Sequence, residues 1–269
     1  MNVYLDNAAT TPVAPEVVEA MIPVLFHTFG NPSSTHAFGR QAKALLENSR
    51  RNIAQALHCA PSEIIFTSGG TEADNMALHA AVTQLGVKRI ITSAIEHHAV
   101  GHTADAIKDS NGIDVVHLSL DSKGNVDLQE LETYLQDGTP TLVSLMHANN
   151  EIGNMIDLHE IGNLCNTYNA IFHSDTVQTV GHFPFDLKNT PVHFITGAGH
   201  KFHGPKGVGI LYIHESIKIK PLVHGGAQER NMRAGTENLY GIVGFAKALE
   251  IATDHFEKDS TYIGGLKLY

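Results

Sequence analysis

Short runs of apolar and β-branched residues alternate with longer segments of helical periodicity along the chain. Each short run predicts a strand. The runs occupy residues 63–67, 88–92, 114–118, 141–146, 170–173, 192–196 and 207–213. Because strands that alternate with helices are typical of βα units, the sequence predicts an α/β fold, with a mainly parallel seven-stranded sheet between helices.

Two of the intervening helices carry a clear apolar stripe. Leu158, Ile161, Leu164 and Cys165 repeat at helical spacing, so Cys165 is predicted to face the core. Apolar positions over 242–252 predict a second, longer helix that continues beyond residue 256.

The domain boundaries follow from the ends of this pattern. Residues 13–256 are predicted to form one large domain, and residues 1–12 and 257–269 look like parts of an incomplete smaller domain.

Composition narrows the functional classes. The net charge is -10 and no cluster of Lys and Arg is present, which argues against a nucleic-acid surface. Two cysteines exclude a disulfide framework and suit a reducing compartment. The sequence shows no signal-peptide pattern and no apolar run of about 18 residues, so we expect a cytoplasmic protein without a membrane segment.

The most informative loop is 199–207, Gly-His-Lys-Phe-His-Gly-Pro-Lys-Gly, which follows a predicted strand. A partly desolvated lysine near other cations loses its proton more easily and can attack a carbonyl, so Lys201 is a candidate for binding an aldehyde cofactor. The loop also resembles a phosphate-binding Walker loop, but Pro205 separates the glycine from the lysine of that motif. Taken alone, the loop fits a cofactor lysine and a structural loop equally well.

A second loop, 66–74, contains Gly70 and Thr71 before a predicted helix. Glycines allow a ligand to approach the backbone, and the positive end of a helix attracts a phosphate. Thr71 is expected to cap that helix, with Asp74 three positions on as in a capping box. An ordinary capped helix without a ligand explains this loop at least as well.

Two further loops carry polar side chains after predicted strands. His97 could lie flat on a heteroaromatic ring and relay protons. The rival interpretation, a zinc pair at His98 and His102, lacks a carboxylate in register. Asn150 belongs to consecutive asparagines that fit either a polar ligand or an Asx turn.

The last loop, 172–178, places Asp175 at the end of an apolar strand, where a carboxylate needs a cationic partner to stay ionised. A protonated pyridine nitrogen is such a partner, and Gln178 could donate to a phenolic oxygen of the same ring. Together with Lys201, His97 and the Gly70 loop, these residues predict a site for pyridoxal 5′-phosphate.

At this point the sequence resembles the cysteine desulfurases of the class V aminotransferase family, in particular the NifS-like and IscS-like group. The resemblance rests on motifs that span nearly the whole chain. They are Tyr-Leu-Asp-Asn-Ala-Ala-Thr-Thr-Pro at 4–12, Gly-Asn-Pro-Ser-Ser at 30–34, His-Ala-Asn-Asn-Glu-Ile-Gly at 147–153, the lysine loop at 199–207 and Arg-Ala-Gly-Thr-Glu-Asn at 233–238. The resemblance implies a fold-type I transferase that uses pyridoxal 5′-phosphate.

The resemblance also implies a role for each candidate residue. Lys201 would bind the cofactor covalently and later move the Cα proton of the substrate, and His97 would stack on the ring. The other contacts implied are Asp175 with the ring nitrogen, Asn150 and Gln178 with the phenolic oxygen, Thr71 and His200 with the phosphate beside Gly70, and Thr236 reaching the phosphate from a second subunit.

By this resemblance the activity is conversion of L-cysteine to L-alanine, with sulfur passed as a persulfide to an acceptor or scaffold protein for iron-sulfur cluster or thio-cofactor assembly, in a homodimer. The family's nucleophilic cysteine and substrate-binding arginine lie beyond the position where this chain ends, so we expect weak turnover by the chain alone. Ala198 stands where relatives usually have a phosphate-binding serine. The alternatives are another class V enzyme such as a selenocysteine lyase, a non-catalytic docking or dimerisation module and, more remotely, a histidine-based metal hydrolase.

Overall fold

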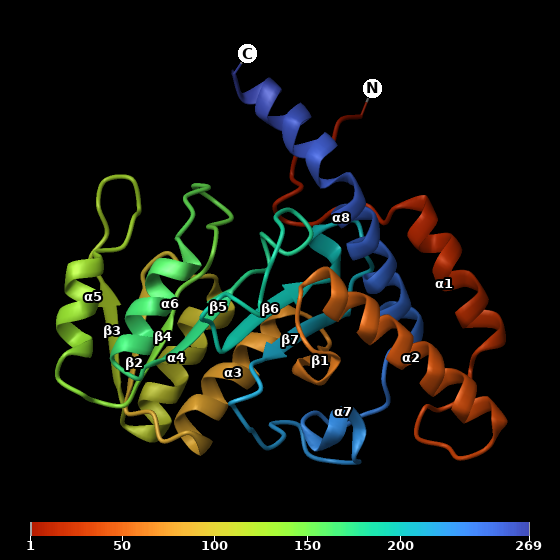
Figure 1. Ribbon diagram of the computed structural model, residues 1–269, viewed down its shortest axis with the longest axis horizontal. Coiled ribbons are helices and arrows are strands. Elements are labelled where there is room, and N and C mark those ends of the chain that lie inside the picture. Colours follow the sequence, from red (N-terminus) through yellow and green to blue (C-terminus); the bar gives the residue numbers. More distant parts are fainter. Residues whose placement is uncertain (1, 269) are drawn as a thin grey trace.

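The computed structural model describes residues 2–268, and a single seven-stranded sheet forms its centre (Figure 1). The strands follow the order β1-β7-β6-β5-β4-β2-β3 across the sheet. Their bounds are β1 (Ile64–Thr67), β2 (Arg89–Ser93), β3 (Asp114–Leu118), β4 (Thr141–Ser144), β5 (Ile171–Asp175), β6 (Phe194–Ala198) and β7 (Gly209–Ile213). All seven predicted strands are present, and the predicted α/β architecture is confirmed.

The strands of the sheet are mostly parallel and buried, which explains why the predicted strand segments are so uniformly apolar. Strands β2 to β6 pair in parallel, and β7 alone runs in the opposite direction between β1 and β6. Strands β1, β2, β4, β6 and β7 are buried along their whole length, whereas the edge strand β3 is largely open to solvent. A strand covered on both faces needs apolar residues at every position.

Helices cover both faces of the sheet and create two separate cores. One core lies under α3 (Gly70–Gln84) and α4 (His98–Asn111). The other face is covered by α1 (Pro15–His27), α2 (Ala37–Ala56), α5 (Leu128–Leu135), α6 (Leu158–Thr167) and α8 (Leu239–Leu268). The predicted stripe of α6 is confirmed, with Cys165 fully buried.

The segment before α1 and the last turns of α8 lie on the same side of the molecule in Figure 1. Residues after Asn7 lie against the lysine loop, where the Thr11 amide donates to the His200 carbonyl at 2.9 Å and the Ala14 amide donates to the His203 carbonyl at 3.0 Å. The long C-terminal helix is confirmed as α8. The division at residues 13 and 256 stays a prediction.

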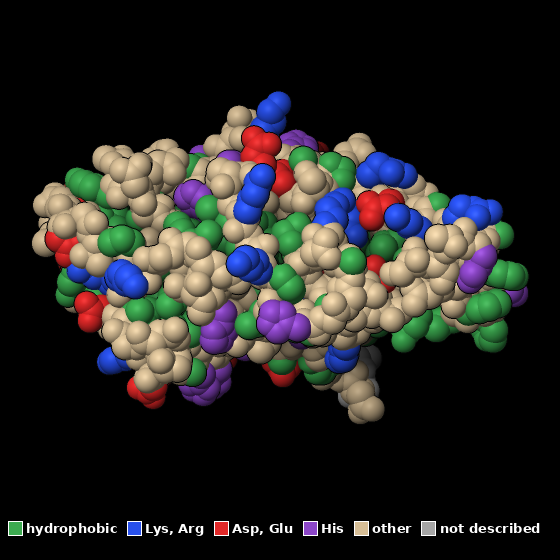
Figure 2. All heavy atoms as spheres, turned by 90° about the horizontal axis from the view of Figure 1, so that it is seen from below, with side chains coloured by type: hydrophobic (Ala, Val, Ile, Leu, Met, Phe, Trp, Pro, Cys, Tyr) green, Lys and Arg blue, Asp and Glu red, His purple; other side chains and the backbone are tan. Residues whose placement is uncertain are grey.

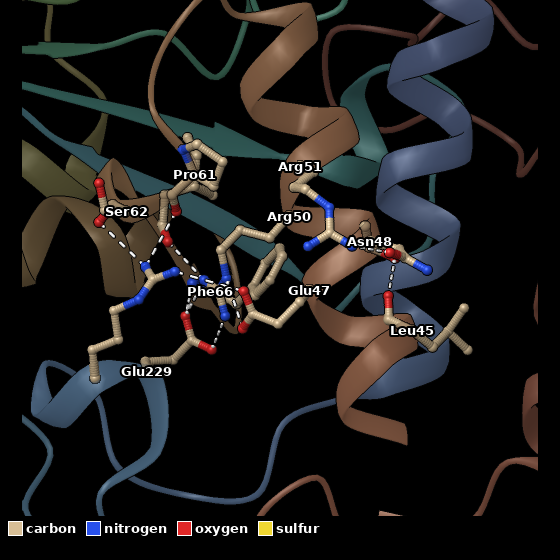
Figure 3. Close-up of polar contacts among 12 residues, drawn as sticks. Leu45, Glu47, Asn48, Arg50, Arg51, Pro61, Ser62, Phe66 and Glu229 are labelled. Atoms are coloured by element: carbon tan, nitrogen blue, oxygen red, sulfur yellow. Dashed lines mark hydrogen bonds and ion pairs between the residues drawn. The ribbon is translucent and has the colours of Figure 1, made fainter. Parts of the chain in front are cut away.

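A buried ion pair fixes the segment before α8 (Figure 3). The guanidinium of Arg50 makes two 2.8 Å hydrogen bonds to the Glu229 carboxylate and a third, at 2.7 Å, to the Ile64 carbonyl. Glu229 lies in α7 (Gln228–Asn231), a short turn in which three successive residues adopt positive φ angles, 44° at Glu229, 57° at Arg230 and 64° at Asn231. Left-handed backbone at residues other than glycine is unfavourable, so the ion pair holds a strained turn in place.

One end of the surface is conspicuously apolar. Figure 2 shows green side chains gathered at its right-hand end, which is the end that α1 occupies in Figure 1. We call the exposed apolar residues here the α1 patch; they are Val18, Ile22, Leu25, Phe26, Phe29 and Phe38. Among residues 2–268, no helix combines the length and apolar character needed to cross a membrane.

Candidate active site

A cavity of about 240 Å³ opens where the carboxyl ends of the parallel strands meet. Eight of the nine candidate residues line it, although they come from five separate loops. They are Gly70, Thr71, His97, Asn150, Asp175, Gln178, His200 and Lys201. Ala9, Asp74, Met146, Val177 and Ala198 complete the wall. The structure therefore brings these eight residues together around one cavity, and their roles as a cofactor site stay predictions.

Lys201 ends the short 3₁₀ turn that follows β6. Its Nζ donates to the carbonyl oxygens of Ala8 and Ala9, the latter at 3.1 Å. Burial lowers the pKa of the Lys201 ammonium, although the Asp175 and Asp6 carboxylates oppose this effect. A lysine in such surroundings has a larger neutral fraction at neutral pH, which is the form that attacks a carbonyl.

Asp175 is the last residue of β5 and is buried, with 5% of its surface exposed. Its Oδ1 accepts from the Val177 amide at 2.9 Å and from the Thr196 hydroxyl at 3.4 Å. Burial raises the pKa of Asp175 to about 7, and the nearby Asp74 carboxyl adds to the rise. A buried carboxylate without a cation of its own fits the ring nitrogen of pyridoxal 5′-phosphate, which is protonated when it pairs with an acid.

His97 is the N-cap of α4, and its Nδ1 accepts from the Ala99 amide at 3.1 Å. This bond leaves the proton of the neutral ring on Nε2. The neighbouring Glu96 was not singled out from the sequence. Its Oε1 accepts from the Ser93 hydroxyl at 2.8 Å and the Met146 amide at 3.0 Å, so it ties the loops after β2 and β4 together; burial raises its pKa to about 8.

The consecutive asparagines have different surroundings. Asn149 is buried, and its side chain bonds to the Ile95 carbonyl at 2.7 Å and accepts from the amides of Glu151 and Ile152. It therefore builds the turn itself. Asn150 lines the cavity, as does Gln178, whose Nε2 donates to the Ala8 carbonyl at 3.0 Å. Asn150 Nδ2 also donates to the Glu151 carboxylate at 2.7 Å, so each amide nitrogen has one N–H left for a polar group of a ligand.

The start of α3 forms the other end of the cavity. Helix α3 begins at Gly70, and Gly69 is its N-cap without a side-chain cap, so the capping expectation for Thr71 and Asp74 is wrong. A Cβ at Gly70 would lie 2.6 Å from the Val177 side chain, which shows why only glycine fits there. The cavity continues outward past His200 to Lys206, a cation not singled out from the sequence. A helix N-terminus beside a lysine and an imidazole suits a phosphate.

The ninth candidate residue, Thr236, does not line the cavity of its own chain. It is exposed on the segment between α7 and α8. This position is compatible with the predicted contact to a second subunit, which the structure of one chain leaves open.

The histidine-metal alternative gains nothing from the geometry. The rings of His98 and His102 stack with their centroids 4.7 Å apart. Within residues 2–268, no group of three metal-ligating side chains comes together.

Comparison with known proteins identifies the family. The model of the aminotransferase class-V family matches residues 3–264. The chain belongs to this family. It is 46% identical over 269 residues to the cysteine desulfurase IscS of Dictyoglomus turgidum, covering 99% of this chain and 68% of the relative. It is 48% identical to the cysteine desulfurase IscS of Methanosarcina thermophila, covering 96% of this chain and 64% of the relative.

Solved structures agree. A NifS-like protein superposes with a TM-score of 0.94 at 41% identity, over 99% of this chain and 74% of the other. A structure described as SspA in complex with cysteine superposes with a TM-score of 0.87 at 36% identity, over 93% and 72% of the two chains. The predicted resemblance to NifS-like and IscS-like cysteine desulfurases is confirmed, as is the fold-type I architecture.

Proposed function

We propose that this chain binds pyridoxal 5′-phosphate through Lys201 and takes part in removing sulfur from L-cysteine, which leaves L-alanine. The observation that carries the proposal is that the Lys201 amine and the buried, uncompensated Asp175 carboxylate line the same cavity. The bound cofactor would supply the electron sink for a carbanion at Cα. Relatives named cysteine desulfurase IscS support the choice of substrate.

Each wall of the cavity has a distinct task in this proposal. Asp175 would hold the ring nitrogen in its charged form, while His97 would lie against the ring and assist proton transfer through its Nε2–H. Asn150 and Gln178 donate to the phenolic oxygen. Lys201, once free of the cofactor, carries the Cα proton of the substrate.

The phosphate would be held at the start of α3 by the amides near Gly70, by the Thr71 hydroxyl and by His200. Burial lowers the pKa of His200, and the cations at Lys201 and Lys206 lower it further. A neutral His200 can donate one hydrogen bond to the phosphate. Thr236 would come from the partner of a homodimer, for which the α1 patch offers apolar area to bury.

The sulfur acceptor is proposed to be a group other than the two cysteines of the printed sequence. Burial raises the pKa of both thiols, Cys59 and Cys165, to about 12. A protonated thiol is a poor nucleophile. Neither cysteine is therefore proposed as the nucleophile, and the final acceptor is proposed to be a partner such as an iron-sulfur scaffold protein, in the cytoplasm.

An absorbance titration tests the proposal. Pyridoxal 5′-phosphate added to the wild-type chain should give the shifted absorbance band of a lysine-bound cofactor, which borohydride fixes covalently. Lys201→Ala should lose the band and the covalent label, and Lys108→Ala, on the exposed face of α4, should keep both. Addition of L-cysteine should then change the wild-type spectrum. A wild-type chain without the band, or a Lys201→Ala variant that is still labelled, would contradict the proposal.

A further inference from the structure

Beneath the cavity, a carboxyl group and an imidazole contact each other inside the protein. Asp74 of α3 and His173 of β5 have 1% and 0% exposed side chains, and 3.3 Å separates Asp74 Oδ1 from His173 Nε2. Neither atom has a hydrogen-bond partner of good geometry among the described residues. The other ring nitrogen, His173 Nδ1, lies 2.8 Å from the Ser144 hydroxyl of β4.

The contact between these atoms requires a proton. A carboxylate facing the lone pair of a neutral imidazole would be repulsive, and a carboxylate facing the N–H of a neutral imidazole would still leave one net negative charge buried, which is costly. One shared proton removes both problems, either as a carboxylic acid donating to the imidazole or as a carboxylate accepting from an imidazolium. In both forms the pair carries no net charge.

The charge of this pair matters because Asp175 lies two residues after His173 on the same strand, and both carboxyl groups, Asp74 and Asp175, line the cavity. Two carboxylates in one dry site cannot both stay ionised without a cation. Asp175 accepts from the Val177 amide at 2.9 Å, which favours its charged form. The Thr196 hydroxyl favours the charged form of both carboxyl groups, and Asp74 has the His173 imidazole in addition.

We propose that Asp74 and His173 share one proton as a neutral positioning pair, so that Asp175 is the single buried negative charge available to the ring nitrogen of the cofactor. The pairing of Asp74 with His173 stands on this chain alone; its purpose rests on the proposed function. Neither residue is expected to touch the reacting atoms.

The proton count can be measured without any cofactor. The unfolding equilibrium constant of the apo chain changes tenfold per pH unit for each proton by which the folded and unfolded states differ. Unfolded Asp and His titrate near pH 3.9 and 6.5, respectively, so between these values the unfolded pair holds one proton, on the histidine. The folded wild-type pair also holds one, and contributes no slope in this window.

The two single variants should therefore depart from the wild type in opposite directions. In Asp74→Asn, His173 is neutral when folded, because burial lowers its pKa to about 4. The unfolded state then holds one more proton, and stability relative to the wild type rises about tenfold per pH unit from 4.5 to 6. In His173→Gln, the folded state keeps a proton on Asp74, because burial raises its pKa to about 7. Relative stability then falls about tenfold per pH unit over the same window.

The double variant Asp74→Asn/His173→Gln should run parallel to the wild type, because neither of its states carries the shared proton. Other titratable groups around the pair, namely Asp175, Glu96, His97 and Lys201, are present in all four proteins. If the wild-type pair is neutral, each variant leaves a neutral pair beside them, so their contributions to the slope cancel. His58→Gln is a matched control, since His58 lies 3.8 Å from Asp186 in an exposed pair and should leave the slope unchanged.

Urea unfolding from pH 4.5 to 6 decides the matter. If Asp74→Asn runs parallel to the wild type, the folded pair holds no proton and the inference is overturned. This arm is sufficient should His173→Gln fail to fold.

Affinity for pyridoxal 5′-phosphate then tests the purpose of the pair. Asp175→Asn should weaken binding of the cofactor at least about tenfold more than Asp74→Asn does, because only Asp175→Asn removes the buried charge. Equal losses of affinity in the two variants would overturn the inference. A wild-type chain that binds no cofactor would contradict the proposed function, while the pH slopes would still report on the pair.

Discussion

Two clusters of charged side chains are buried in this protein, and they are built on opposite principles. Around Arg50 and Glu229, every charge meets its counterpart: the carboxylate also accepts from the Phe66 amide at 2.8 Å, and the guanidinium lies 4.6 Å from the centre of the Phe66 ring (Figure 3). Around Asp175, the carboxyl groups of Asp74 and Asp175 and the imidazole of His173 lie together, and no arginine or lysine forms an ion pair with them among the described residues.

The difference indicates what each cluster is for. A buried ion pair in which every polar atom has a partner favours one conformation over others, and here it favours the left-handed turn of α7. A buried carboxylate whose pKa is raised costs stability, and such groups are typical of functional sites. In the first cluster, Arg50 and Glu229, the protein itself supplies every partner, and we call it the closed cluster. In the second, Asp74, Asp175 and His173, a ligand is needed to balance the charge, and we call it the open cluster.

The largest effect is expected from breaking the closed cluster. Glu229→Gln leaves the buried Arg50 charge with only the longer contact to Glu47, at 3.3 Å, and should lower the free energy of unfolding by about 3 kcal/mol. Arg50→Met combined with Glu229→Gln should recover at least about half of this loss, because no bare charge remains. Urea unfolding at pH 7.5 measures both.

The surface pair of Lys247 and Glu250, 2.8 Å apart and partly exposed, provides the control. Lys247→Ala should change the free energy of unfolding by less than about 1 kcal/mol. A Glu229→Gln protein as stable as Lys247→Ala would contradict the contrast between the clusters.

Removing the charge of the open cluster should have the reverse consequence. Asp175→Asn should weaken binding of pyridoxal 5′-phosphate about 100-fold, in line with the loss of one charged hydrogen bond worth about 3 kcal/mol. Without the cofactor, the Asp175→Asn chain should be at least as stable as the wild type at pH 8. Because the folded pKa of Asp175, about 7, lies above its unfolded value, the wild type loses stability as pH rises from 4 to 7, and Asp175→Asn avoids this loss.

Equilibrium dialysis with the cofactor and urea unfolding at pH 5 and 8 separate the two effects. The difference in free energy of unfolding between Asp175→Asn and the wild type is compared at the two pH values. If the variant is less favoured at pH 8 than at pH 5, the carboxylate stabilises the fold and the prediction is wrong.

The sequence predicts the open cluster better than the closed one, for a physical reason. Ligand groups in an α/β fold follow the strands, so Lys201, Asp175 and His97 could be located from the strands before them. Arg50 and Glu229 are separated by 179 positions and follow no periodic pattern. Their contact depends on how α2 and the α7 turn pack, which local sequence does not encode.

Around the site, two of the residues missed were polar groups inside regular elements. Asp74 fitted a capping pattern at the start of α3, yet it points inward to His173, because the helix begins two residues earlier than a Thr71 cap requires. His173 lies within an apolar strand and resembled an ordinary core residue. The reversed direction of β7 was equally invisible, since a strand buried on both faces has the same composition in either direction.

The smallest expected effect comes from adding one donor to the open cluster's cavity. Ala198 is buried at the end of β6 and lines the wall near Gly70. Ala198→Ser would place a hydroxyl there, and a hydrogen bond to a charged phosphate should tighten binding of pyridoxal 5′-phosphate about tenfold. The apo chain should unfold as the wild type does, because the ligand and not the protein completes this bond. Ala106→Ser, on the exposed face of α4, should leave the affinity unchanged. If Ala198→Ser and Ala106→Ser bind pyridoxal 5′-phosphate equally well, the phosphate does not lie beside Ala198 and the Gly70 loop does not bind it.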